Sequence, residues 1–513
     1  MRDADQLPLT IDCQPLSITE VVAAAREGRR VELGSNAVAA IGRSREVIDR
    51  VVASREIVYG VTTGFGRLAD RVIPPDDLER LQRNLIMSHS VGVGAPLDAD
   101  VTRAMTLLRI SALARGYSGI RLETVQALID MLNAGVVPFV PRKGSVGASG
   151  DLAPLAHLAL VLIGQGHAWV DGELVTGQVA LRRRGLRPVE LTAKEGLALI
   201  NGTQLMTAMG CLLCEDGCNV MEVADIAGAM TVDAVRGSAR PFDARVQEIR
   251  PHPGQVAAAA HLRALLSGSE IVRSHQHDMR HKVQDPYSLR CMPQVHGASR
   301  ATLSHCRDVM EVEINSVTDN PLVFPEDGSI ISGGNFHGEP LAMAMDYLAI
   351  GLAELADISE RRIEVMLDPS FSELPPFLTM HGGVESGFMV SQYTAAALIS
   401  ENRVLAHPAS VDSVPTSANQ EDHVSMGVTS ALKAEQILRN VESVLAIELL
   451  AAAEGIDFRR PLRTSPALEA VHALIRSKVP HVAEDRVLYP DIEIVTEMIR
   501  TRQIARAAAG TGG

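Results

Sequence analysis

The pattern of apolar and polar positions predicts a chain built mainly from long helices. Apolar residues recur at i, i+3, i+4 and i+7, the spacing of one helix face. This spacing extends over residues 293–317, 338–368, 388–406 and 424–455. Glycine and proline are scarce in these segments and lie mostly near their ends. Helices of such length bury their apolar faces against one another, so the pattern predicts a bundle.

The N-terminal part of the chain has shorter elements. Helical periodicity fills residues 76–135, including a helix over 101–114 that Asp100 could cap. A capping-box pattern, Ser17-Ile18-Thr19-Glu20, predicts the start of a helix that runs through Ala25. Strand-like runs are short, as at residues 168–174. We therefore predict a mainly α fold, with a smaller N-terminal region over 1–205 and a bundle with C-terminal helices over 206–513.

One glycine-rich run stands apart from the helical pattern. It reads Gly144-Ser145-Val146-Gly147-Ala148-Ser149-Gly150-Asp151-Leu152-Ala153-Pro154-Leu155. Its three glycines allow the backbone to fold back, and small residues flank Ser149. A helix is expected to follow, with Asp151 as its cap and Pro154 in its first turn.

Such a loop permits an unusual cyclisation of the backbone. The Gly150 nitrogen attacks the Ala148 carbonyl, two waters leave, and Ser149 becomes a methylidene on a five-membered ring.

Three other interpretations compete with this one. A phosphate loop would need Gly-Lys-Ser/Thr, but Lys143 lies on the wrong side. A serine hydrolase elbow would read Gly-x-Ser-x-Gly, which is absent here. An ordinary capped turn remains the third possibility.

Polar, glycine-rich connectors interrupt the helical segments. They are Tyr59–Gly66, Asn201–Gln204, Val283–Arg290, Gly333–Gly338 and Ser417–His423. Connectors of this kind are where a helical scaffold places its binding and catalytic side chains. No internal repeat or low-complexity tract is visible.

The glycine-rich run and these connectors together resemble the motifs of the aromatic amino acid ammonia-lyases, in the family's order from Tyr59 to Glu421. In that family, Ala-Ser-Gly cyclises to 4-methylidene-imidazol-5-one (MIO), an electrophile formed without metal or external cofactor. The resemblance implies a long-helix bundle of the ammonia-lyase and fumarase-like type with a smaller N-terminal MIO-bearing region. It also implies a homotetramer whose active sites are shared between subunits.

The resemblance assigns a role to each matching residue. MIO would form from Ala148, Ser149 and Gly150, and Tyr59 would be the base. Hydrogen bonds to MIO or to the substrate head group would come from Asn201, Gln284 and Tyr287, and Arg290 would bind the substrate carboxylate. Phe336 would form a wall of the ring pocket, and His89 and Glu421 would face the substrate side chain. Arginine suits the carboxylate because its planar fork donates two bonds at once. The alternative interpretation of Arg290 is a surface salt bridge, of the kind that is common and weak.

Substrate choice follows from two segments. Family members that act on phenylalanine or tyrosine usually show Phe-Leu or His-Leu, and Asn-Gln-Asp, where this chain has Ser88-His89 and Gln420-Glu421-Asp422. The likeness is therefore greatest to members that convert L-histidine to trans-urocanate and ammonia. Met292 departs from their pattern, which bears on fine substrate tuning. The alternatives are a tyrosine or phenylalanine ammonia-lyase, a 2,3-aminomutase, and an inactive helical scaffold.

Composition limits the partners. The chain has 513 residues, a net charge of −14 and 3% aromatic residues, which argues against a nucleic-acid surface. The N-terminus lacks a basic segment followed by an apolar run, and the longest apolar stretches are too short to span a bilayer. We expect a cytoplasmic enzyme that binds a small amino acid and no membrane.

Three cysteines require separate consideration. Cys211, Cys214 and Cys218 have a C-x2-C-x3-C spacing that could hold zinc or an iron-sulfur cluster. The same spacing is one face of a helix, and the neighbouring residues are largely apolar. No fourth ligand stands nearby in sequence, and cysteine packs as a small hydrophobe. We therefore predict core packing and no metal.

Overall fold

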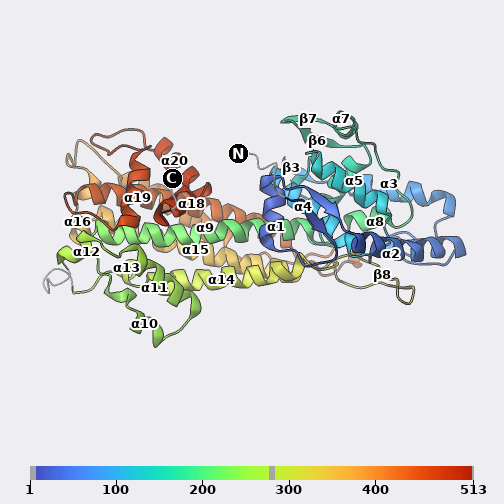
Figure 1. Cartoon of the computed structure of the whole chain (residues 1–513), viewed down its shortest axis with the longest axis horizontal. Coiled ribbons are helices and arrows are strands. Elements are labelled where there is room, and N and C mark those ends of the chain that lie inside the picture. Colours follow the sequence, from blue (N-terminus) through green and yellow to red (C-terminus); the bar gives the residue numbers. More distant parts are fainter. Residues whose placement is uncertain (1–6, 276–282, 511–513) are drawn as a thin grey trace. The chain divides into compact units, whose positions relative to one another are not determined.

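A computed structural model describes residues 7–275 and 283–510 (Figure 1). It divides into two compact units whose segments alternate along the chain. The first unit comprises Met1–Glu215, Arg307–Met345 and Pro408–Leu432, and the second comprises Asp216–Cys306, Asp346–His407 and Lys433–Gly513. The predicted mainly α class is confirmed, while the division at residues 205 and 206 remains a prediction from the sequence.

Helices are the predominant secondary structure of both units. Those of the first unit are α1 (Ile18–Val22), α2 (Ser35–Ser54), α3 (Leu78–His89), α4 (Ala99–Ala114), α5 (Leu122–Asn133), α6 (Leu152–Leu162), α7 (Gly177–Arg183) and α8 (Glu195–Ile200). Those of the second unit are α10 (Ala244–Glu248), α11 (Pro253–Leu265), α12 (Glu270–His275), α13 (Tyr287–Arg290), α16 (Pro369–Ser372), α17 (Met389–Leu405), α19 (Pro466–Arg476), α20 (Tyr489–Arg500) and α21 (Gln503–Ala508). Four long helices have residues in both units: α9 (Gln204–Ala234), α14 (Met292–Glu313), α15 (Glu339–Leu367) and α18 (Gly427–Asp457).

The strands are short and all belong to the first unit. They are β1 (Leu9–Ile11), β2 (Val31–Leu33), β3 (Val93–Pro96), β4 (Val137–Pro138), β5 (Pro141–Lys143), β6 (His167–Val170), β7 (Glu173–Thr176), β8 (Leu322–Phe324) and β9 (Ser329–Ile331). β1 and β2 pair in parallel, whereas β3 with β5, β4 with β6, β6 with β7, and β8 with β9 pair antiparallel. In the ranges that the structure describes, none of the helices is both long and apolar enough to cross a membrane.

The second unit is a bundle held by a buried polar network as well as apolar packing. Glu448 of α18 accepts hydrogen bonds from Thr231 of α9 at 2.8 Å and from Arg362 of α15 at 2.8 Å. His296 of α14 bonds to Asp225 of α9 at 2.7 Å. Buried charges are stabilised only when they are paired in this way, so the network fixes which helix faces meet.

The long helices predicted from the apolar spacing are confirmed within a few residues. Residues 293–317, 338–368, 388–406 and 424–455 correspond to α14, α15, α17 and α18. The capping box of Ser17 and Glu20 is also present. The α-helical part of this element ends at Val22, and a π-helix follows directly over Ala23–Glu27. The predicted start signal was therefore more accurate than the predicted end.

Two local expectations were wrong. Asp100 does not cap α4, because the helix begins at Ala99 and the carboxylate bonds to the adjacent Val101 amide at 2.9 Å. The run over residues 168–174 is a hairpin of β6 and β7, not one strand. Its turn residues Asp171 and Gly172 have φ of 53° and 80°, the left-handed pair that tight hairpins favour.

The N-terminal six residues, where no leader was expected, lie outside the described residues.

The cysteine triplet lies on α9, as its spacing predicted. Cys211 and Cys214 are fully buried, and Cys218 is half-buried. Burial, followed by the neighbouring Cys214, raises the pKa of the Cys211 thiol well above its ordinary value. Because metals bind the thiolate, this environment favours an apolar packing role.

We expect Cys214→Ala to lower the free energy of unfolding by about 1 kcal/mol through lost packing, without loss of activity in the folded enzyme. Denaturant unfolding measures this change, and Cys218→Ala is the control with a smaller expected cost because its side chain is half-buried. The packing assignment would be wrong if Co²⁺ gave the wild-type protein a thiolate-to-metal absorption band and Cys214→Ala removed that band.

Candidate active site

The glycine-rich run forms a tight turn in the first unit. The Gly150 N–H donates to the Gly147 carbonyl at 3.2 Å, which leaves Ala148 and Ser149 at the two central positions. Ser149 has φ of +48°, in the left-handed region that non-glycine residues rarely adopt. Both central residues are half-buried and thus accessible. The turn holds the segment folded back on itself, so these residues fit the MIO group that their sequence implies.

A second backbone segment presses against this turn. The Asp151 N–H donates to the Gly202 carbonyl at 2.7 Å, and the Gly202 N–H donates to the Ser149 carbonyl at 3.2 Å. A Cβ atom at Gly150 would lie 2.0 Å from the Gly202 oxygen, a distance that no side chain tolerates. The close approach requires glycine and brings Asn201 beside the turn.

Asp151 has a different role from the predicted one. It occupies the N-cap position of α6 but makes no side-chain bond to that helix. Its Oδ2 instead accepts the amides of Leu205 at 2.8 Å and Met206 at 3.1 Å, in the first turn of α9. Burial raises the pKa of Asp151 to about 7, and these amide bonds oppose the rise. The carboxyl thus joins the reactive turn to the start of a second helix.

Asn201 is held by a buried network. Its Nδ2 donates to the Asn320 carbonyl at 2.6 Å, and Arg109 donates from Nη1 to the Asn201 carbonyl at 2.7 Å and to Gln204 Oε1 at 2.9 Å. Burial lowers the pKa of Arg109 to about 10, and the charge of Asp319 opposes this. The Asn201 Oδ1 is buried without a partner among the described residues, which leaves an acceptor for a ligand.

The loops that carry Tyr59 and Phe336 belong to the same unit. The Gly66 N–H donates to the Tyr59 hydroxyl oxygen at 3.3 Å and orients the phenol. Asn320, whose carbonyl holds Asn201, also accepts the Gly333 N–H through Oδ1 at 2.8 Å. One asparagine therefore anchors both Asn201 and the loop that continues to the half-buried Phe336.

His89 and Glu421 lie near enough to interact electrostatically. The His89 Nδ1 bonds to the Leu85 carbonyl at 2.9 Å, so this nitrogen carries the proton and Nε2 is an acceptor. Burial lowers the pKa of His89, while the Leu85 bond and the Glu421 charge oppose the change. The Glu421 Oε2 accepts the Thr416 hydroxyl at 2.8 Å. A neutral imidazole and a carboxylate thus offer two acceptors to a ligand that carries N–H groups.

Gln284, Tyr287 and Arg290 form a separate group in the second unit. The Arg290 guanidinium lies 4.2 Å from the centre of the Tyr287 ring, and its Nε donates to the Asp285 carbonyl at 3.0 Å. With the Gln284 amide turned so that its oxygen faces Arg290, that oxygen accepts from Nη2 at 2.6 Å. These partners are all neutral, so the arginine is presented without a carboxylate partner among them.

The predicted residues thus fall into two sets. The first unit contains Tyr59, His89, Ala148, Ser149, Gly150, Asn201, Phe336 and Glu421, and the second unit contains Gln284, Tyr287 and Arg290. Arg109 and Asn320, which hold Asn201, were not predicted from the sequence. The sequence did contain a signal for Arg109, because a single charged residue within an apolar helix is expected to be buried with a partner. Asn320 had none.

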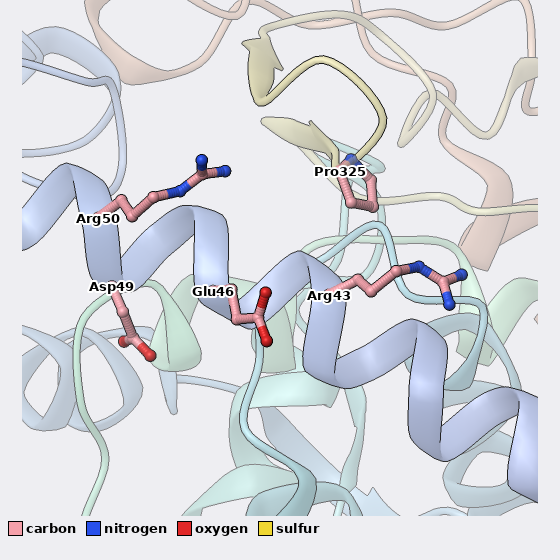
Figure 2. A pocket seen from close by; sticks show the side chains of 5 residues that line it. All are labelled: Arg43, Glu46, Asp49, Arg50 and Pro325. Atoms are coloured by element: carbon pink, nitrogen blue, oxygen red, sulfur yellow. The ribbon is translucent and has the colours of Figure 1, made fainter.

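An open pocket of about 510 Å³ lies elsewhere in the first unit and contains none of these residues. Arg43, Glu46, Asp49 and Arg50 of α2 line it together with Pro325. Figure 2 shows the two guanidinium groups extending from α2 with Glu46 between them. Charged side chains of both signs along one exposed helix resemble an ordinary solvated helix face.

Known proteins resemble the chain over nearly its whole length. The family model of the aromatic amino acid lyases matches residues 16–477. The histidine ammonia-lyase of Caldanaerobacter subterraneus subsp. tengcongensis is 54% identical over 496 residues, which cover 97% of each chain.

Two solved structures share the fold. Histidine ammonia-lyase from Trypanosoma cruzi has 45% identity and a TM-score of 0.91, covering 99% of this chain and 96% of its own. Tyrosine aminomutase from Streptomyces globisporus has 39% identity and a TM-score of 0.94, covering 98% and 99%. The family match and these identities lead to one conclusion: the chain belongs to the aromatic amino acid lyase family.

Proposed function

We propose that this protein eliminates ammonia from L-histidine to give trans-urocanate, with MIO formed from Ala148, Ser149 and Gly150. The observation that carries the proposal is the pair of acceptors formed by His89 and Glu421 in the unit that contains the reactive turn. An imidazole side chain offers N–H groups to such acceptors. The 54% identity to a histidine ammonia-lyase supports the same substrate.

The reaction requires a good leaving group and a base beside a weakly acidic hydrogen. MIO supplies the electrophile that captures the amino group. The deprotonated oxygen of Tyr59, oriented by the Gly66 amide, accepts the β-hydrogen as a proton and becomes a hydroxyl. The buried Oδ1 of Asn201 accepts a hydrogen bond from the substrate head group. The bond from Arg109 to the Asn201 carbonyl keeps that acceptor in place.

The substrate carboxylate binds Arg290 in this proposal. Among the described residues Arg290 contacts neutral groups, and it can exchange them for a carboxylate and gain a charge-assisted bidentate pair. Tyr287 beside it is 69% exposed, unusually open for an aromatic ring in a catalytic group. We therefore propose a homotetramer in which another copy of the chain covers this group and the active sites are shared between subunits.

A tyrosine aminomutase is the second candidate, supported by the TM-score of 0.94 to such an enzyme. A tyrosine hydroxyl could donate to Glu421, as an imidazole N–H could. Phenylalanine could not, and its binding would desolvate both acceptors without partners. The product therefore distinguishes the candidates more directly than the fold does.

Cyclisation predicts a mass deficit. The purified protein should weigh less than its translated sequence by two water molecules, because Gly150 closes on Ala148 and Ser149 loses its hydroxyl. Ser149→Ala should show the unmodified mass of that variant, whereas Ser54→Ala, an exposed serine of α2, should keep the deficit. Intact-mass spectrometry measures all three. A wild-type mass equal to the translated one would favour the inactive scaffold.

Substrate selectivity forms the next prediction. Separate incubations with L-histidine, L-tyrosine and L-phenylalanine, followed by ultraviolet spectra, should give urocanate at appreciable rate, with phenylalanine rejected by roughly 10⁴-fold or more. Glu421→Ala should lose most turnover of histidine yet keep the mass deficit, while the exposed neighbour Asp422→Ala should retain turnover. Faster coumarate or cinnamate release, or a β-amino acid as main product, would overturn the histidine assignment.

A further inference from the structure

Three potential metal ligands from two segments of the chain converge in the first unit. They are His337 and Glu339, around the start of α15, and His423, which precedes α18. One nitrogen of each histidine and one oxygen of the glutamate all lie within 4.8 Å of one another. We propose that these three side chains bind a divalent transition-metal ion, in a site that the elimination reaction does not use.

The orientation of His337 suits a ligand. Its Nε2 lies 3.2 Å from the His423 carbonyl oxygen, which can only accept, so Nε2 carries the proton and Nδ1 retains its lone pair. Histidines that bind metals commonly donate their other ring N–H to a backbone carbonyl in this way. The two imidazole rings lie nearly parallel, 5.8 Å apart between centres. The second histidine is therefore held beside the first.

Glu339 supplies a second, independent indication. Its Oε2 is buried and has no hydrogen-bond partner in the described part of the chain. A buried carboxylate oxygen without a donor is costly, and a cation would satisfy it. The residue is the first of α15, a helix of 29 residues, so its backbone position is fixed. The carboxylate is thus placed before any metal arrives.

The ligand set favours zinc among the common ions. Two imidazoles and one carboxylate suit Zn²⁺, and magnesium or calcium would prefer oxygen ligands alone. His423 is exposed, which gives an ion a route from solvent and leaves room for a water as fourth ligand. A spread of 4.8 Å requires only a small inward movement of two side chains to reach tetrahedral distances.

A comparable group in the second unit serves as a contrast. Glu454, Asp457 and His481 also cluster, but Arg476 lies 2.8 Å from both carboxylates. A resident guanidinium already neutralises those acids and would repel a cation. In the part of the chain that the structure describes, Glu339 forms no ion pair with an arginine or a lysine.

The position suggests what the ion would do. His337 directly follows Phe336, and His423 comes two residues after Glu421. A bound ion would clamp the loop that carries the ring wall to the loop that carries the acidic acceptor. This consequence rests on the proposed function, whereas metal binding itself does not.

The test is stoichiometric binding to the full-length enzyme. After chelator treatment, equilibrium dialysis against Zn²⁺ should give one ion per chain. His423→Ala and Glu339→Gln should each weaken binding at least tenfold, whereas His481→Ala and Cys214→Ala should bind like the wild type. Zn²⁺ should also raise the melting temperature of the wild type and leave that of His423→Ala unchanged.

Binding below one ion per chain, or equal binding in His423→Ala and Glu339→Gln, would overturn the site. Because His423 is exposed, its removal should leave the fold intact, and the mass deficit of that variant verifies this independently. Absence of urocanate together with intact Zn²⁺ binding would count against the proposed function alone.

Discussion

The close approach of two backbone segments, at Gly150 and Gly202, is the constraint on which the candidate site depends. Hydrogen bonds run in both directions between these segments, at 2.7 Å and 3.2 Å, so neither can move without the other. The contact fixes the strained turn at Ser149 and places Asn201 next to it. Asp151 then extends the same connection to α9. Local strain of this kind persists only where surrounding structure holds it.

Much of the architecture could be predicted from the sequence because it follows from periodicity. Long apolar stripes predicted α14, α15, α17 and α18 within a few residues, since an apolar stripe at helical spacing must be buried against the core. Helix caps were less predictable. The Asp151 carboxylate can bond to any nearby amide, and the amides it meets belong to a helix more than fifty residues later in the chain.

The candidate site was predictable in its residue types and not in its grouping. The motifs identified which side chains belong to the site. They did not show that Gln284, Tyr287 and Arg290 lie in the second unit while the other predicted site residues lie in the first. Asn320 anchors two loops through backbone and side-chain atoms, which no local pattern records. The convergence of His337, Glu339 and His423 was hidden for the same reason, because 84 residues separate Glu339 from His423 in the sequence.

If the contact between Gly202 and the turn enables cyclisation, a side chain at position 202 should prevent it, and the intact mass of Gly202→Ala measures this. A Cβ there would meet Gln204 Oε1 at 2.6 Å, Arg109 Nη1 at 2.7 Å and the Thr318 carbonyl at 2.8 Å. The folded variant should lack the two-water deficit. Gly172→Ala, at φ of +80° with nothing within 4 Å of the new Cβ, should retain it. A folded Gly202→Ala protein with the full deficit would show that cyclisation does not depend on this contact.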